Sequence, residues 1–182
     1  MNTNTQTQLF ALYQRYEQLF ESNTQRLPSV DFDPEWLSPC QVGDVVNDKI
    51  RWQAVKRDNK VDFSNIEEAL EVTLHPSIEA LFCTAYSEHI PCEFEGHPIE
   101  LIQVWNEQDF LMLQENMIAH FMMQKRLNKP ASMFIASCSD EMQIISILNE
   151  TGQVQLETLG KKQEAVLAES LAEFLEKLTP VI

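Results

Sequence analysis

Apolar residues in the first part of the chain recur at the spacing of one helix face. Leu9, Tyr13, Tyr16 and Phe20 would lie together on a helix over residues 5–24. The polar residues between them would face water, so the pattern predicts an amphipathic first helix that packs against a core.

The longest predicted helix lies in the second half of the chain. Asn106 can cap its start, and the helical pattern continues to about Asn128, shortly before Pro130. Lys125 and Arg126 would lie in its last turn, where positive charge suits the negative end of the helix dipole.

Three shorter helices are predicted from local signals. Ser64 and Glu67 have the spacing of a capping box, which predicts a helix to about Leu74. Pro76 suits the first turn of the next helix, and a final helix is expected over residues 162–178.

The other apolar segments alternate with polar residues or are rich in β-branched residues, which predicts strands. Residues 27–40 contain three prolines and are expected to be an extended loop. The predicted strands are two short ones within 42–55, a hairpin within 92–104, and single strands over 132–137, 142–148 and 153–159. Strands joined by short turns and interspersed with helices predict an α+β fold, in which a mainly antiparallel sheet packs with several helices in a single domain of residues 1–182.

Composition places this domain among cytosolic proteins. The polar N-terminus lacks the features of a secretory signal, and no apolar run approaches the roughly 20 residues that span a bilayer. Cytosolic thiols stay reduced, so all the cysteines are expected to be free: Cys40, Cys83, Cys92 and Cys138.

The acidic residues are concentrated in the middle third of the chain. The net charge is −15, and no Lys or Arg occurs between Lys60 and Lys125, a segment that contains 12 Asp and Glu residues. Such a charge argues against nucleic acid, bare membrane and direct lipid insertion, because phosphate groups would repel the protein.

This acidic segment has two interpretations. It could be a solvated surface that keeps the protein soluble, or a face that docks a basic partner. The second interpretation gives nine candidate partner-binding residues: Glu67, Glu68, Glu71, Glu79, Glu88, Glu93, Glu95, Glu100 and Asp109.

Recognisable catalytic chemistry is absent from the sequence. It contains no nucleotide-binding, nucleophile-elbow or zinc-protease motif, so we predict no catalytic residue and no cofactor. Cys83, His89, Cys92 and His97 are residue types that bind zinc, but their spacing is irregular. Buried cysteines and surface histidines are the alternative, and we predict no metal site.

A thiol hydrolase would need Cys40 or Cys138 to meet His75 or His120 in space. On the long helix, however, His120 is expected to be an interior or boundary residue. The methionines of this helix are expected to fill the core rather than to line an adaptable groove: Met112, Met117, Met122 and Met123.

The run LIQVWNEQDFLMLQENMIAHFMMQKRLNKPASMFIA, residues 101–136, resembles the central signature of the Syd family. Shorter matches occur in the expected order, among them Ser38-Pro39-Cys40, the isolated Trp52, and ISILNETGQV before the closing LAEFLEKL. The resemblance covers about the whole chain.

This resemblance implies a compact domain of the SUKH superfamily without enzymatic activity. It implies binding to cytosolic loops of SecY, the channel subunit of protein translocation, through an acidic concave surface. The protein would then lie peripherally on the cytoplasmic face of the inner membrane and would sequester, monitor or negatively regulate SecY that is not properly assembled. Cytosolic loops of membrane proteins are rich in Lys and Arg, so the acidic segment supports this interpretation independently.

Two alternatives remain open from the sequence. One is a SUKH-type immunity protein whose acidic face neutralises a basic toxin. The other is a cryptic metal-dependent or thiol hydrolase that uses the Cys and His residues.

Overall fold

A seven-stranded antiparallel sheet forms the centre of the protein. The computed structural model describes residues 3–58, 61–158 and 165–182. Neighbouring strands follow the order β11-β10-β9-β8-β7-β6-β12. Their bounds are β6 Ile90–Phe94, β7 His97–Leu101, β8 Ser132–Cys138, β9 Gln143–Leu148, β10 Val154–Thr158, β11 Ala165–Ala168 and β12 Thr179–Pro180. The fold is α+β, as predicted.

Short strands outside this sheet form two small sheets. One has the order β1-β3-β2, with β1 at Ser29–Asp31, β2 at Gln41–Val46 and β3 at Lys49–Trp52. The other pairs β4, Val55–Lys56, with β5, Ala85–Tyr86. The predicted pair of strands within 42–55 is therefore confirmed, whereas β1 lies in a segment expected to be an extended loop.

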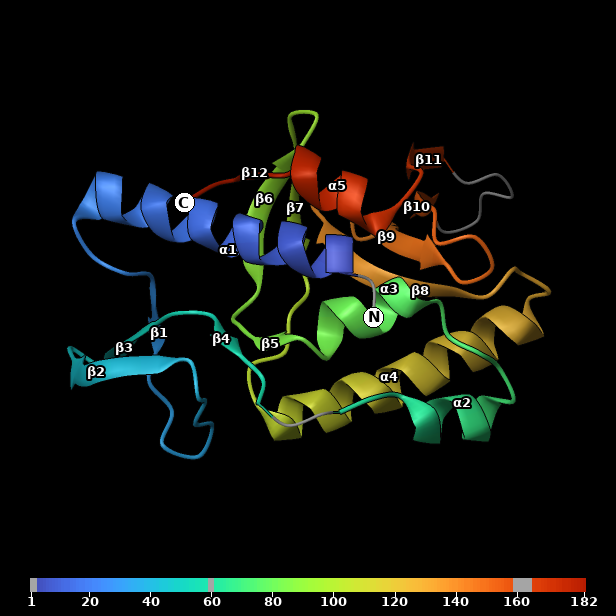
Figure 1. Cartoon of the computed structure of the whole chain (residues 1–182), viewed down its shortest axis with the longest axis horizontal. Helices are drawn as coiled ribbons and strands as arrows, with labels where there is room; N and C mark the ends of the chain where they lie inside the picture. Colours follow the sequence, from blue (N-terminus) through green and yellow to red (C-terminus); the bar gives the residue numbers. More distant parts are fainter. Residues whose placement is uncertain (1–2, 59–60, 159–164) are drawn as a thin grey trace.

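Helices cover the two faces of the main sheet. Their bounds are α1 Thr3–Thr24, α2 Ser64–Leu70, α3 Pro76–Phe82, α4 Glu107–Arg126 and α5 Leu171–Lys177. Figure 1 shows α1 and α5 in front of β6 and β7, and the rings of Phe94 and Phe174 join this layer with centroids 5.0 Å apart. Helix α4 packs against β8 on the other face, where His120 and Phe134 make an edge contact at 5.4 Å.

Two predicted helices end or begin differently in the structure. The capping box at Ser64 is wrong, because the Ser64 hydroxyl donates to Asp62 and the Glu67 carboxylate accepts from the backbone N–H of Leu74 at 2.7 Å. Helix α2 stops at Leu70, and Glu71 follows in the left-handed conformation. The helix predicted to reach about Leu74 is therefore one turn shorter.

The C-terminal prediction also needs correction. Part of the predicted helix, residues 162–164, lies outside the described residues, and Ala165–Ala168 forms β11 paired with β10. Helix α5 begins only after Ser170, whose hydroxyl accepts from the N–H of Glu173. Pairing with a neighbouring strand here overrides a local preference for helix.

A candidate acidic binding surface

The structure divides the nine candidate carboxylates between two regions of the molecule. Helices α2 and α3 and the cap between them carry one group: Glu67, Glu68, Glu71 and Glu79. The β6–β7 hairpin and the segment just before it carry the other: Glu88, Glu93, Glu95 and Glu100. Asp109 lies in the first turn of α4. Figure 1 shows that α2 and the tip of the hairpin lie on opposite sides of the molecule.

Glu93 and Glu100 share one face of the hairpin. Glu93 pairs with Pro98 across the ladder, and Glu100 pairs with Pro91. This register makes the two glutamates diagonal neighbours, a relationship in which side chains lie roughly 7 Å apart. We call Glu88, Glu93, Glu95 and Glu100 the hairpin acids.

The face that carries Glu100 is open to water at β7. Pro98 and Glu100 on this face are exposed, whereas Ile99 and Leu101 on the opposite face are buried. Since α4 packs against β8 rather than β7, Glu100 and Glu95 remain exposed, whereas Glu93 and Glu88 are half-buried.

Glu88 and Glu100 act on the same side chain of α1. Burial, together with the nearby Cys92, Glu88 and Glu100, raises the pKa of the Tyr16 phenol to about 12. Both carboxylates therefore contribute to one negative field beside the first helix.

Three of the nine candidates have structural hydrogen bonds. Besides the Glu67 contact with Leu74, Asp109 accepts from the backbone N–H of Trp105 at 2.8 Å, and Glu88 accepts from the N–H of His89 at 3.1 Å. Glu67, Glu88 and Asp109 are also half-buried. These contacts make all three weaker candidates than the exposed carboxylates.

Cations do not pair with the candidate carboxylates. Across residues 3–58, 61–158 and 165–182, none of the nine forms a salt bridge with Lys, Arg or His. By contrast, Glu107 of the same acidic segment pairs with Arg57, whose Nη2 lies 2.6 Å from its Oε1. No direct ion pair among the described residues therefore neutralises the candidates, although Glu95, after Glu173, contributes to the raised pKa of Lys177.

The Cys and His residues do not form a metal site. No group of three or more His, Cys, Asp or Glu residues in the described part of the chain has the geometry to hold a metal ion. His89 accepts from the backbone N–H of Gln103, and Cys92 is buried against the α1–α5 layer.

The thiols are poor nucleophiles. All four cysteines are free. Burial raises the pKa of Cys40 to about 11 and those of Cys83 and Cys92 to about 12, and it also raises that of Cys138. Because a thiol hydrolase needs the thiolate, these environments do not suit nucleophilic catalysis.

The methionines of α4 depart from their predicted role. Met117 is fully buried, but Met112, Met122 and Met123 have exposed fractions of 49%, 61% and 51%. Core filling is therefore wrong for three of the four, because α4 turns only one face toward β8. His120, in contrast, is a boundary residue as expected.

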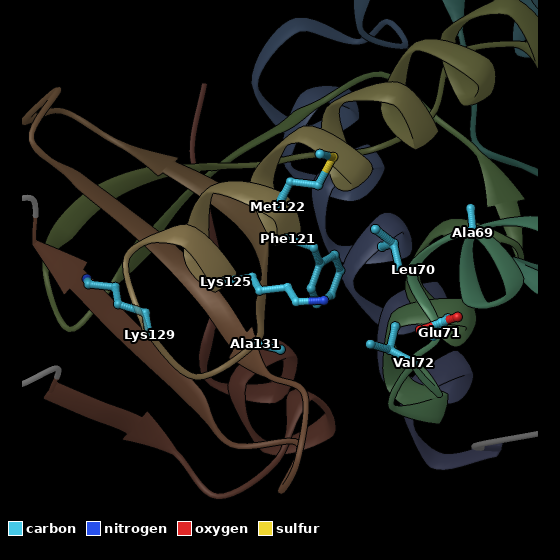
Figure 2. A pocket seen from close by; sticks show the side chains of 9 residues that line it. All are labelled: Ala69, Leu70, Glu71, Val72, Phe121, Met122, Lys125, Lys129 and Ala131. Atoms are coloured by element: carbon cyan, nitrogen blue, oxygen red, sulfur yellow. The ribbon is translucent and has the colours of Figure 1, made fainter.

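A cavity between α2 and α4 was not predicted. Figure 2 shows it lined by residues from both helices and from the segment after α4. Its walls come from segments about 50 residues apart, so no local pattern in the sequence indicates it. Of the nine candidate acids, Glu71 lines it.

Among the helices that the structure describes, none combines the length and the apolar character needed to cross a bilayer.

Comparison with known proteins places this chain in a family. The family model described as "Syd protein (SUKH-2)" matches residues 6–180. The chain is 61% identical to a protein named Protein Syd from Psychromonas ingrahamii, over 100% of this chain and 99% of that protein. Proteins of the same name from Aliivibrio salmonicida and Aeromonas hydrophila are 41% and 40% identical, over 93% and 84% of this chain and 92% and 84% of theirs. The chain therefore belongs to the Syd family.

Proposed function

We propose that this protein is a non-catalytic binding protein that docks on basic cytosolic loops of SecY through the hairpin acids. The observation that carries the proposal is the set of unpaired carboxylates on the open side of β6 and β7. Family membership supports SecY as the partner, as the resemblance implied. A basic loop is the chemical complement of this surface.

The arrangement of the hairpin acids favours a peptide with several cations. Glu93 and Glu100 lie diagonally on one face, and Glu95 extends the charge to the turn. A loop with two or three Lys or Arg residues would contact them together and relieve their mutual repulsion. Electrostatic steering by such a field increases encounter rates by roughly 10 to 1,000-fold at low ionic strength.

This mode of docking accounts for a peripheral position on the inner membrane. Anionic lipid repels a chain with a net charge of −15, so the channel rather than the bilayer would hold the protein at the cytoplasmic face. By occupying cytosolic loops, the protein would compete with other ligands of the channel and so sequester or monitor unassembled SecY.

Capture of SecY in detergent across a salt series tests the proposal. The triple variant Glu93→Lys, Glu95→Lys and Glu100→Lys should lose capture at low salt. A matched variant, Glu21→Lys, Glu35→Lys and Glu150→Lys, has the same change in net charge at exposed acids outside the acidic segment and should retain it. For the native protein, capture should weaken as salt rises.

A third variant separates the two groups of candidates. Glu68→Lys, Glu71→Lys and Glu79→Lys change the α2–α3 group and leave the hairpin intact. Loss of capture in this variant alone would show that the docking surface lies on α2 and α3 instead of on the hairpin. Equal loss in all three variants would show a dependence on net charge only and would contradict a local docking surface.

A further inference from the structure

A cavity of about 540 Å³ lies between α2 and α4, with the segment after α4 as its floor. Figure 2 shows Leu70 and Phe121 facing each other across it, with Val72 and Ala131 at one end. Cavities of this size and apolar character commonly hold small molecules. The site lies on α2 and α4, away from the β6–β7 hairpin (Figure 1).

One cation reaches into this apolar space. Figure 2 shows Lys125 extended from α4 toward α2, with its ammonium group beside the Phe121 ring, whereas Lys129 points away. In the part of the chain that the structure describes, the Lys125 ammonium forms no salt bridge. Glu71 also lines the cavity, but its carboxylate points to the outer side.

The apolar wall is partly open and adaptable. Phe121 has an exposed fraction of 5%, so its ring forms a firm base, whereas Met122 at the mouth is 61% exposed. A methionine side chain adjusts readily to the shape of what it contacts. An apolar ligand would cover this surface and remove it from water.

We propose that the cavity binds a hydrophobic carboxylate, whose anionic group pairs with Lys125 while its apolar body lies over Leu70, Val72 and Phe121. Of the two lysines that line the cavity, Lys125 alone extends into it and can pair with one negative charge, and an apolar wall rejects strongly hydrated anions. A lipid surface is the less suitable occupant, because the site is a hollow on a protein with a net charge of −15. This inference is independent of SecY binding.

Calorimetric titration with decanoate, below its micelle-forming concentration, tests this site. We expect saturable binding at one site per chain. Lys125→Met keeps the length of the side chain and removes its charge, so it should weaken binding about tenfold or more. Arg126→Met is the matched control, since this exposed neighbour on α4 does not line the cavity and its loss should change affinity less than about twofold.

Two further measurements are informative. Binding of decanol, which lacks the carboxylate, tests the role of the charged group, and methyl-labelled methionine shows where the ligand lies. Decanol should bind more weakly than decanoate and should be insensitive to Lys125→Met. During titration the methyl resonance of Met122 should shift, whereas that of Met142, which lines a different cavity, should not.

Four results would overturn the inference. The first is that decanoate shows no saturable binding, and the second is that Lys125→Met and Arg126→Met change its affinity equally. The third is that only the methyl resonance of Met142 shifts. The fourth is that the protein binds anionic vesicles but not monomeric decanoate. The last result would indicate contact with a membrane instead.

Discussion

Gly152 and His75 pack so closely that a β-carbon at position 152 would lie 2.3 Å from Cε1 of the imidazole ring. Gly152 also has a φ of +78°, in the left-handed region, within the turn between β9 and β10. On the other side of the contact, the N–H of His75 donates to Asn149 at 2.9 Å. The start of α3 is thereby fixed to the turn between β9 and β10.

Replacing Gly152 with alanine should destabilise the protein by about 2–5 kcal/mol, as the sum of left-handed strain and steric overlap. Gly96→Ala is the matched control. Gly96 has a φ of +80°, but nothing lies within 4 Å of its added β-carbon. It should therefore cost only about 1–2 kcal/mol, measured as the free energy of unfolding in urea.

A double variant separates steric overlap from backbone strain. His75→Ala removes the ring that the new β-carbon would meet, so Gly152→Ala should cost less in that background. Equal costs for Gly152→Ala in the two backgrounds would show that backbone strain alone accounts for the effect.

The Arg57–Glu107 pair should respond asymmetrically to substitution. The Arg57 guanidinium lies between the rings of Tyr86 and Phe110, 4.3 and 4.5 Å from their centroids, and its side chain has an exposed fraction of 1%. The Glu107 side chain is 57% exposed. Removing Glu107 would leave a buried cation, whereas removing Arg57 would leave a carboxylate that water can reach.

Glu107→Gln should therefore destabilise the protein by about 2–4 kcal/mol, and Arg57→Met by about 1 kcal/mol or less. Methionine can fill the space between the two rings. Denaturant unfolding of both variants measures the difference. A larger loss for Arg57→Met would show that the cation itself, through its contacts with the rings, is the main source of stability.

Stability should decline as the pH falls below about 6.5, the ordinary histidine value. Burial lowers the pKa values of His75 and His120, so these residues take up protons more readily in the unfolded chain than in the native protein. Unfolding is therefore favoured as the pH falls through the unfolded value toward the lowered native values.

His120→Phe should make this decline shallower. The Nε2 atom of His120 is buried and, within the described residues, has no hydrogen-bond partner. Phenylalanine would keep the contacts with Phe121 and Phe134 and remove the titrating group. Urea midpoints measured from pH 8 to pH 5 test this, and an unchanged slope would contradict a contribution from His120.

Elements with complete local signals could be predicted from the sequence. Asn106 caps α4 through a 2.8 Å hydrogen bond from the N–H of Asp109, and the helix ends at Arg126, within two residues of the expected position. Asn47 and Asp48 adopt the positive φ values of 53° and 58° in the turn between β2 and β3, the two strands predicted within residues 42–55. In both places, the residues that define the structure are neighbours in sequence.

Elements that depend on distant partners were missed. Strand β11 exists because it pairs with β10, and the Glu67 carboxylate reaches Leu74 because α2 ends early. The buried Glu157 carboxylate, which accepts from the hydroxyls of Ser132 and Ser146, also has no sequence signature. Such contacts arise only when strands have been brought into register.

The acidic surface could be predicted from the sequence only in part. Charge counting found the segment that carries the excess of carboxylates, but it treated nine residues as one group. Folding separates Glu68 and Glu71 on α2 from Glu93 and Glu100 on the hairpin. A linear count contains no information about that separation, because it depends on where α2 packs.

The short strand β12 disfavours the addition of a strand from another molecule to this edge of the main sheet. Thr179 and Pro180 pair with β6, and the N–H of Val181 donates to Pro91 at 3.0 Å. Because N–H groups alternate in direction along a strand, the group at position 180 would face outward, and proline has none. A strand from a neighbouring molecule would therefore lack one hydrogen-bond donor at this edge of the sheet. This discourages edge-to-edge aggregation even at high concentrations of the protein.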